Sequence, residues 1–236
     1  NVVRDCLGDP RSEAIVPRTR RVAESTIDFV LRSDRSVSQL ATLMATDYYT
    51  YTHSINVSVF SVALAHKVGV SREDLAEFAT GALLHDVGKS EIPLALITKS
   101  GPLSAEEMQV MQQHVRIGER LLNTHQRLSA FAMLAVKQHH EKLDGTGYPR
   151  GLDKDQLHLF GRISAIADCF DAMTTNRSYQ KAMKPYDALL IMRNQLRGKY
   201  DQALLDEFIR LLKAPDAKAR KQDAVELVQG LLPAAS

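Results

Sequence analysis

The chain of 236 residues has no tryptophan and only two cysteines, Cys6 and Cys169. Two cysteines are too few for a disulfide framework, so we expect a reducing, cytoplasmic compartment. No apolar run approaches the roughly 18 residues that a membrane-spanning helix needs, and the first residues do not resemble a signal peptide. We therefore expect that this segment makes no contact with a membrane.

An excess of charge of one sign is also absent. Thirty lysines and arginines are balanced by 28 aspartates and glutamates, which leaves a formal net charge of +2. A domain dedicated to DNA or RNA would carry a concentrated basic face, so we expect no nucleic-acid polymer as a partner. A small anionic ligand, held by local charges or by metal ions, is compatible with this balance.

Strand patterns are lacking, and apolar residues recur at helical spacing through most of the chain. The sequence therefore predicts an all-α fold. The expected helices cover about residues 18–31, 40–44, 51–68, 72–84, 104–118, 129–140, 161–175, 185–197, 201–213 and 216–229. Ser71 followed by Asp74, and Ser104 followed by Glu107, are typical of helix N-termini. Residues 141–160, rich in glycine and aspartate, are expected to form a loop.

His85 and Asp86 directly follow an apolar run at the end of a predicted helix. Polar groups pressed against a core need partners, because burial of an unpaired group is costly. A metal ion would be such a partner, since imidazole nitrogen and carboxylate oxygen are natural ligands. A hydrogen-bonded buried pair is the alternative at this point.

A second pair, His139 and His140, ends another predicted helix. Neighbouring residues diverge by about 100° on a helix, so these two histidines can address two metals or two faces of one. The alternative is a favourable interaction with the dipole at the helix C-terminus. His114 stands one turn before Gly118, where the missing side chain would let another backbone or a ligand approach closely.

Two further predicted helices carry candidate ligands. His53 lies near the start of one, with Asn56 one turn later. Asp168 and Asp171 lie beside the apolar stripe of the other, and spacing alone does not choose between them. A helical bundle can bring five histidines and two aspartates from separate helices to one cavity. Such mixed ligands suit Mn, Fe, Zn or Ni, and two metals about 3.5–4 Å apart form a site for phosphoester hydrolysis.

Three segments resemble the motifs of one known family. Residues 85–89 (HDVGK) resemble the HD motif with its Gly-Lys extension, and residues 139–141 (HHE) with 144–149 (DGTGYP) resemble the second motif of the HD-GYP family. Residues 162–179 resemble the next conserved block of that family. The resemblance covers about residues 50 to 200, and the run from 139 to 149 is its most specific part.

The resemblance implies an HD-type helical bundle with a C-terminal HD-GYP helical extension, over residues 36–236. Residues 1–35 would be an N-terminal helical lead-in or linker. HD-GYP domains usually follow a sensor or receiver domain, and a chain that begins with Asn1 rather than Met fits a missing regulatory domain of this kind. Pairing of two copies through the N-terminal helix is left open, because no sustained heptad supports a homodimer.

HD-GYP proteins similar to this one are bacterial phosphodiesterases that hydrolyse cyclic di-GMP to pGpG and often on to GMP, and some prefer 3',3'-cyclic GMP-AMP. The resemblance implies this enzyme activity in second-messenger signalling. A catalytically silent module that binds the dinucleotide or a partner protein is an alternative, but such relatives usually lose a ligand. A phosphohydrolase of (p)ppGpp or dNTPs is another alternative, which the DGTGYP loop disfavours.

The family pattern also implies a ligand set for two divalent transition metals, Fe or Mn in the first place, with Ni, Co or Zn as further candidates. By that pattern Asp86 bridges both metals, and Asp168 rather than Asp171 is a ligand. One metal is held by His53, His85, Asp86 and Asp168, and the other by His114, His139, His140 and Asp86.

Substrate contacts follow from the same motifs. Asp86 and Lys89 are the expected catalytic residues, since the metals and Lys89 neutralise charge on the phosphoryl oxygens. Arg177 is expected to grip a phosphate through its fork of donors, and Tyr148 to stack on the nucleotide or hydrogen-bond with it. The backbone of Gly145, Thr146 and Gly147 is expected to come close to the ligand.

The sequence departs from the family pattern at two positions. Some members use a glutamate one turn before the first histidine to bind a third metal, and this chain has Tyr49 there, so we expect two metals. A second basic residue often follows the position of Arg177. This chain has Gln180 there with Lys181 beside it, so grip on the second phosphate or the choice of cyclic dinucleotide is expected to differ.

Overall fold

The computed structural model describes residues 12, 14–32, 49–123, 128–176 and 181–213, and within these ranges every regular element is helical. The α-helices are α2 (Ile15–Arg32), α4 (Tyr49–Lys67), α5 (Arg72–Leu84), α6 (Leu94–Ile97), α7 (Ala105–Asn123), α8 (Ala130–Gln138), α9 (Leu159–Thr174), α10 (Pro185–Leu190) and α11 (Gln202–Lys213). The all-α prediction is confirmed. The helices expected at 40–44 and 216–229 lie outside the described residues.

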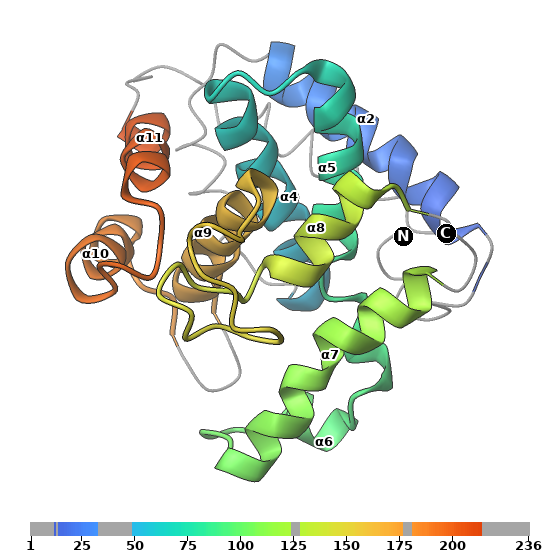
Figure 1. The fold of residues 1–236 in the computed structure, drawn as a ribbon, viewed down its shortest axis with the longest axis vertical. Helices are drawn as coiled ribbons and strands as arrows, with labels where there is room; N and C mark the ends of the chain where they lie inside the picture. The colour runs from blue at the N-terminus through green and yellow to red at the C-terminus, as the bar shows by residue number, and fades with distance from the viewer. Residues whose placement is uncertain (1–11, 13, 33–48, 124–127, 177–180, 214–236) are drawn as a thin grey trace.

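Helix α5 lies at the centre of the bundle, in contact with α2, α4 and α8 (Figure 1). Helix α9 packs on α4 and α8, and α11 packs on α4 and α9. Helix α7 contacts α8 and the short 3-10 turn η1 (Val87–Glu91), and its lower part extends with α6 away from the bundle in Figure 1. The carboxyl ends of α5 and α8 therefore meet α7 and α9, where the candidate ligands lie.

Aromatic side chains hold the helices that carry these ligands. Phe60 of α4, Phe170 of α9 and Phe208 of α11 contact one another edge to face, with ring centroids 5.1 to 5.7 Å apart. Phe78 of α5 stacks on Phe160 of α9 at 4.2 Å. Edge-to-face and stacked pairs are favoured arrangements that add to the effect of burial. The clusters fix α4, α5 and α9 relative to one another.

Helix α2 contributes Ala23 and Ile27 to the main core, and Ile15 and Val16 to a second apolar cluster with residues of α5 and α8. Helix α2 is therefore packed into the helical bundle. The division of the chain into a lead-in of residues 1–35 and a domain of 36–236 stays a prediction.

Helix caps follow the sequence signals. The Ser71 side chain accepts a hydrogen bond from the backbone N–H of Asp74 at the start of α5. Ser104 and Glu107 form a reciprocal capping box, in which each side chain accepts from the other's backbone N–H. His158, expected to be an ordinary loop residue, is the N-cap of α9 and accepts from the N–H of Phe160.

Gly88 allows α7 to approach the end of α5 closely. A side chain there would lie 1.9 Å from the carbonyl oxygen of His114 and 2.5 Å from the backbone nitrogen of Gly118, whereas the nearest atom to a side chain at Gly118 would be 3.4 Å away. The close approach expected at Gly118 is therefore to a neighbouring backbone, and the glycine that requires it is Gly88. It brings His114 next to Asp86.

None of the helices in the described parts of the chain is both long and apolar enough to cross a membrane.

Candidate metal centre

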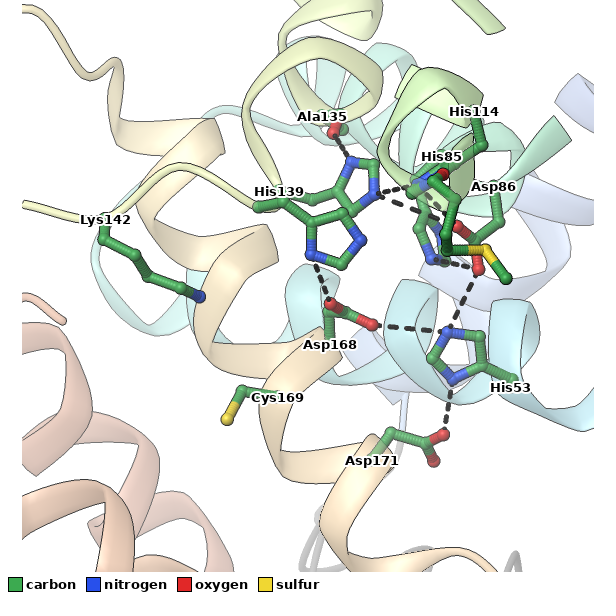
Figure 2. A network of polar contacts seen from close by, with 12 residues as sticks. His53, His85, Asp86, His114, Ala135, His139, Lys142, Asp168, Cys169 and Asp171 are labelled. Atoms are coloured by element: carbon green, nitrogen blue, oxygen red, sulfur yellow. Dashed lines mark hydrogen bonds and ion pairs between the residues drawn. The ribbon is translucent and has the colours of Figure 1, made fainter. Parts of the chain in front are cut away.

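All seven predicted metal ligands come together, and Figure 2 labels each of them except His140. They come from five helices or the residues that follow them, and six of them are buried, with His140 half-buried. They are His53 on α4, His85 at the end of α5, Asp86 before η1, His114 on α7, His139 and His140 at the end of α8, and Asp168 on α9.

The Asp86 carboxylate lies between two groups of histidines. Its Oδ2 is 3.5 Å from Nε2 of His53 and 3.3 Å from Nε2 of His85. Its Oδ1 is 3.3 Å from Nε2 of His114 and 3.8 Å from Nε2 of His139. One carboxylate thus presents one oxygen to each group, which is the arrangement of a ligand shared by two cations.

Two sets of ligand atoms are close enough to hold a metal ion, since the atoms of each set lie within 4.8 Å of one another. We name them the first group and the second group. The first group is His53, His85 and Asp86, and the second group is Asp86, His114, His139 and His140.

Asp168 and Asp171, which spacing could not separate, occupy different places. Asp168 lies between the groups, with Oδ1 3.3 Å from Nε2 of His53 and Oδ2 3.5 Å from Nδ1 of His140. Asp171 lies behind His53, where its Oδ2 accepts a hydrogen bond from Nδ1 at 2.6 Å (Figure 2). Its Oδ1 accepts a second one from the Asn56 amide, also at 2.6 Å. Asp168 is therefore placed to bind a metal, and Asp171 to orient a histidine.

Three more histidines are oriented by backbone carbonyls. In each of them Nδ1 lies against a carbonyl oxygen and donates its hydrogen to it, so that Nε2 carries the lone pair and faces the centre. The acceptors are Ala82 for His85 (2.7 Å), Met111 for His114 (2.7 Å), and Ala135 and Val136 for His139 (3.1 and 3.0 Å). The folded helices thus set the tautomer that a metal ligand needs.

The second group is electrostatically prepared for metal binding. Burial lowers the pKa of His139 to about 3, and burial, together with repulsion from His139 when both rings are protonated, lowers the pKa of His140 well below its ordinary value. Burial also lowers the pKa of His114. These three imidazoles are neutral at neutral pH, so no proton has to leave before a cation binds.

The first group combines opposite effects. Burial opposes the charged form of His53, but hydrogen bonds to Asp168, Asp171 and Asp86 raise its pKa well above the ordinary value. Burial opposes ionisation of Asp86 too, but the charges of Lys89 and His85 hold its pKa well below the usual range. The Asp86 carboxylate is therefore ionised at neutral pH, and it attracts positive charge to this site.

Two ligand atoms support a metal rather than a hydrogen-bonded His–Asp pair. Nε2 of His85 and Oδ1 of Asp86 are fully buried and have no hydrogen-bond partner. Unpaired buried polar atoms are costly, and cations that accept these lone pairs, one at each group, would remove this cost. Imidazole nitrogen with carboxylate oxygen is the donor set of Mn, Fe, Ni, Co or Zn.

Two of the predicted substrate-binding residues lie against this centre. Nζ of Lys89 is 2.5 Å from Oδ2 of Asp86, and its side chain is 30% exposed. The Tyr148 ring stacks on the ring of His140, with centroids 4.6 Å apart and an interplanar angle of 28°. Lys89 therefore combines access to solvent with contact to the shared ligand. Arg177 and Gln180 lie outside the described residues, as does the side chain of Tyr49.

Backbone conformation and close packing explain the two glycines of the DGTGYP loop. Gly145 has a φ of 75°, which side chains rarely adopt. A side chain on Gly147 would lie 2.4 Å from the Cα of Glu141. Thr146 is hydrogen-bonded to the Asp144 carboxylate through its N–H and its hydroxyl. Approach of these residues to a ligand stays a prediction.

The sequence did not predict the hydrogen bonds that three polar residues make near the ligands: Asp171, Asn56 and Glu141. For Asp171, a signal was present. It stands three residues after Asp168 on a helix, so both side chains lie on nearly the same face. A carboxylate that follows a ligand at this spacing is a candidate to hold another ligand in place.

Known proteins resemble the chain over most of its length. The model of the HD domain family matches residues 15–204. A cyclic di-GMP phosphodiesterase of Pseudomonas aeruginosa is 33% identical over 181 residues, which are 77% of this chain and 44% of that protein. The 3'3'-cGAMP-specific phosphodiesterase 3 of Vibrio cholerae is 40% identical over 155 residues, which are 65% of this chain and 33% of that protein.

A solved structure has the same fold. An HDG"Y"P protein from Bdellovibrio bacteriovorus is similar with a TM-score of 0.72 at 21% identity, over 91% of this chain and 69% of that one. At this identity the likeness establishes the fold alone. The chain spans less than half the length of the two curated relatives.

Proposed function

The chain belongs to the HD domain family, and on that premise we propose that it is a metal-dependent phosphodiesterase that hydrolyses a cyclic dinucleotide, cyclic di-GMP in the first place. The observation that supports this most is the position of Asp86, whose two oxygens face two separate groups of histidines. A relative from Pseudomonas aeruginosa, named a cyclic di-GMP phosphodiesterase, supports the choice of substrate.

We propose that the first group with Asp168 would hold one divalent cation, and the second group the other. Fe or Mn suits these ligands best, with Ni, Co or Zn as alternatives. When bound, two such ions neutralise a phosphodiester and make water a nucleophile at neutral pH. Asp86 would serve both ions.

The protein's own residues would position the phosphate and the nucleotide. Lys89 touches the shared carboxylate and is partly exposed, so its ammonium can also reach a phosphoryl oxygen and neutralise the charge that develops there. Tyr148, stacked on His140, offers an aromatic surface for a base or a ribose. Hydrolysis leaves one phosphate as a monoester and a free 3′-hydroxyl, which gives the linear dinucleotide pGpG from cyclic di-GMP.

A 3',3'-cyclic GMP-AMP phosphodiesterase is the second candidate. It is supported by the relative from Vibrio cholerae, which is 40% identical over 155 residues and is named 3'3'-cGAMP-specific. The metal centre serves either substrate, since both carry the same two phosphodiesters. The choice between the two substrates would depend on contacts with their bases, made by residues outside the ligand groups. An N-terminal regulatory domain, a homodimer and a cytoplasmic location stay predictions.

The test is hydrolysis of both dinucleotides by the purified chain, reconstituted without oxygen with Fe(II) or Mn(II). Chromatography of the products separates the linear dinucleotide from the mononucleotides. Cleavage of either substrate that requires metal supports the proposal, and the faster one identifies the preferred substrate. If the protein holds two metals and binds a cyclic dinucleotide without cleaving it, the proposal is contradicted. The protein would then be a catalytically silent binding module.

A further inference from the structure

The loop after His140 folds back on itself and places an aromatic ring beside the metal centre. Asp144 pairs with Asp153 in an antiparallel bridge, and the N–H of Lys154 donates to the carbonyl of Leu143 at 3.1 Å. Between these points the chain carries Tyr148 to the ring of His140. This loop has little regular structure of its own, so the position of Tyr148 depends on specific contacts.

Glu141 supplies two of these contacts from inside the protein. Its side chain is buried, with 1% of the residue exposed. Oε1 accepts a hydrogen bond from the backbone N–H of Arg150 at 2.8 Å, and Oε2 accepts one from the N–H of Leu152 at 3.0 Å. Both oxygens of this buried side chain thus accept from backbone N–H groups of the loop, so Glu141 fixes the returning half of the loop.

The backbone beside Glu141 fixes the other half. The N–H of Tyr148 donates to the carbonyl of His140 at 3.2 Å. Gly147 lies so close to Glu141 that a side chain there would be 2.4 Å from its Cα. Both ends of the segment 147–152 are therefore attached to the same two residues, one of which is a candidate metal ligand.

We infer that Glu141 is a positioning residue, which holds segment 147–152 so that Tyr148 stays stacked on His140 and forms one wall of the substrate site. The last part, the wall, rests on the proposed function, whereas the loop attachment does not. Glutamate is needed because both of its oxygens accept. A glutamine would turn its NH₂ group towards one of the two backbone N–H groups and leave that N–H without a partner.

Contacts on the outer side of the loop are weaker and provide a matched control. Nη2 of Arg150 is 3.5 Å from Oε1 of Glu119, and Nη2 of Arg116 is 3.4 Å from the carbonyl oxygen of Pro149. The Arg150 side chain is 50% exposed. Exposed ion pairs contribute little to stability. Glu119→Gln on α7 therefore alters a contact of the same loop by the same chemical step, together with the ion pair of Glu119 and Lys137, without removing the buried attachment of the loop.

The test measures order in the loop separately from activity. In the unaltered protein we expect the amides of Arg150 and Leu152 to be protected from hydrogen exchange. In Glu141→Gln the exchange of the amide left without a partner should accelerate by roughly tenfold or more, the factor expected when a hydrogen bond to a buried carboxylate is lost. In Glu119→Gln it should stay unchanged. A Tyr148→Trp reporter, in a chain with no other tryptophan, should become more accessible to acrylamide in the Glu141→Gln background.

Metal content and kinetics complete the experiment. Glu141→Gln should keep its metals and show a raised KM for cyclic di-GMP, with a smaller change in kcat. The inference is overturned if the two amides exchange in the unaltered protein as fast as unprotected loop amides, or if Glu141→Gln behaves like Glu119→Gln. The first comparison needs no variant, so misfolding of a variant cannot obscure it. If no cyclic dinucleotide is cleaved, the proposed function fails while the exchange result still decides the loop attachment.

Discussion

Asp171 accepts a hydrogen bond from Nδ1 of His53 at 2.6 Å, on the side of the ring away from Asp86 and Asp168. The carboxylate also accepts hydrogen bonds from Asn56 and from Thr175. It is therefore fixed by three donors, and it fixes the ring in turn. Carboxylates that hold a metal-binding histidine in this way raise its basicity and set its orientation.

Replacing Asp171 by asparagine should weaken metal binding at the first group. The amide cannot accept from both His53 and Asn56 as the carboxylate does, and it carries no charge. We expect metal affinity to fall by about 10- to 100-fold, the range seen for such supporting residues. Competition with a chromophoric chelator measures this. Asp155→Asn, at an exposed position, is the control. Equal metal affinities of the two variants would contradict the role of Asp171 in supporting His53.

Lys89 should be needed for catalysis and not for metal binding. Lys89→Gln removes the ammonium that contacts Asp86, and we expect kcat to fall by about 10²- to 10³-fold, as for other groups that stabilise transition-state charge. Lys99→Gln, which disrupts a surface ion pair with Glu107, should leave kcat unchanged. Steady-state kinetics with metal analysis decides the matter. A Lys89→Gln protein that lost its metals would make Lys89 a structural residue.

Metal binding at the first group should weaken as the pH falls. The pKa of His53 is raised well above its ordinary value by its carboxylate partners, despite burial. A protonated imidazole has no lone pair to give, so affinity should fall by about tenfold for each pH unit below that pKa. Calorimetry of His140→Ala, in which the second group is incomplete, isolates this binding event. Buffers of different ionisation enthalpy should reveal release of a proton.

The second group should behave differently, because burial lowers the pKa of His139 to about 3 and that of His140 well below its ordinary value. Calorimetry of His85→Ala, in which the first group is incomplete, should show binding without proton release between about pH 6 and 8. Equal pH dependence at both groups would show that the carboxylates around His53 do not have the effect assigned to them.

Gly88→Ala should destabilise the protein and displace α7. The added methyl group would lie 1.9 Å from the carbonyl oxygen of His114, so the backbone has to move, at a cost of about 1–3 kcal/mol in the free energy of unfolding. Gly101→Ala is the control, since nothing lies within 4 Å of the added methyl group there. Urea unfolding measures both. Similar midpoints for the two variants would contradict the close packing of α7 on η1.

Most of the fold could be predicted from the sequence because helical periodicity and caps are local signals. The capping box of Ser104 and Glu107, for example, involves residues three positions apart. The candidate ligands were predictable from their place at helix ends and from a family resemblance. Spacing could not separate Asp168 from Asp171, because both lie on nearly the same face of α9. The family resemblance favoured Asp168, and in the folded chain the two aspartates lie against different nitrogens of His53, on another helix.

The attachment of the loop by Glu141 could not be predicted for a different reason. Its partners are backbone N–H groups of Arg150 and Leu152, and every residue except proline carries such a group. No pattern of side chains in the sequence therefore predicts this contact. The same holds for the carbonyls that orient His85 and His114, which follow from the folded helix ends.

The most direct test of the central claim is metal content per chain in the unaltered protein and in Asp86→Asn, prepared without oxygen. Because one oxygen of Asp86 faces each histidine group, the unaltered protein should hold about two metals and hydrolyse a cyclic dinucleotide. Asp86→Asn should hold fewer metals and lose hydrolysis. Retention of both metals and of activity in Asp86→Asn would contradict the shared-ligand account.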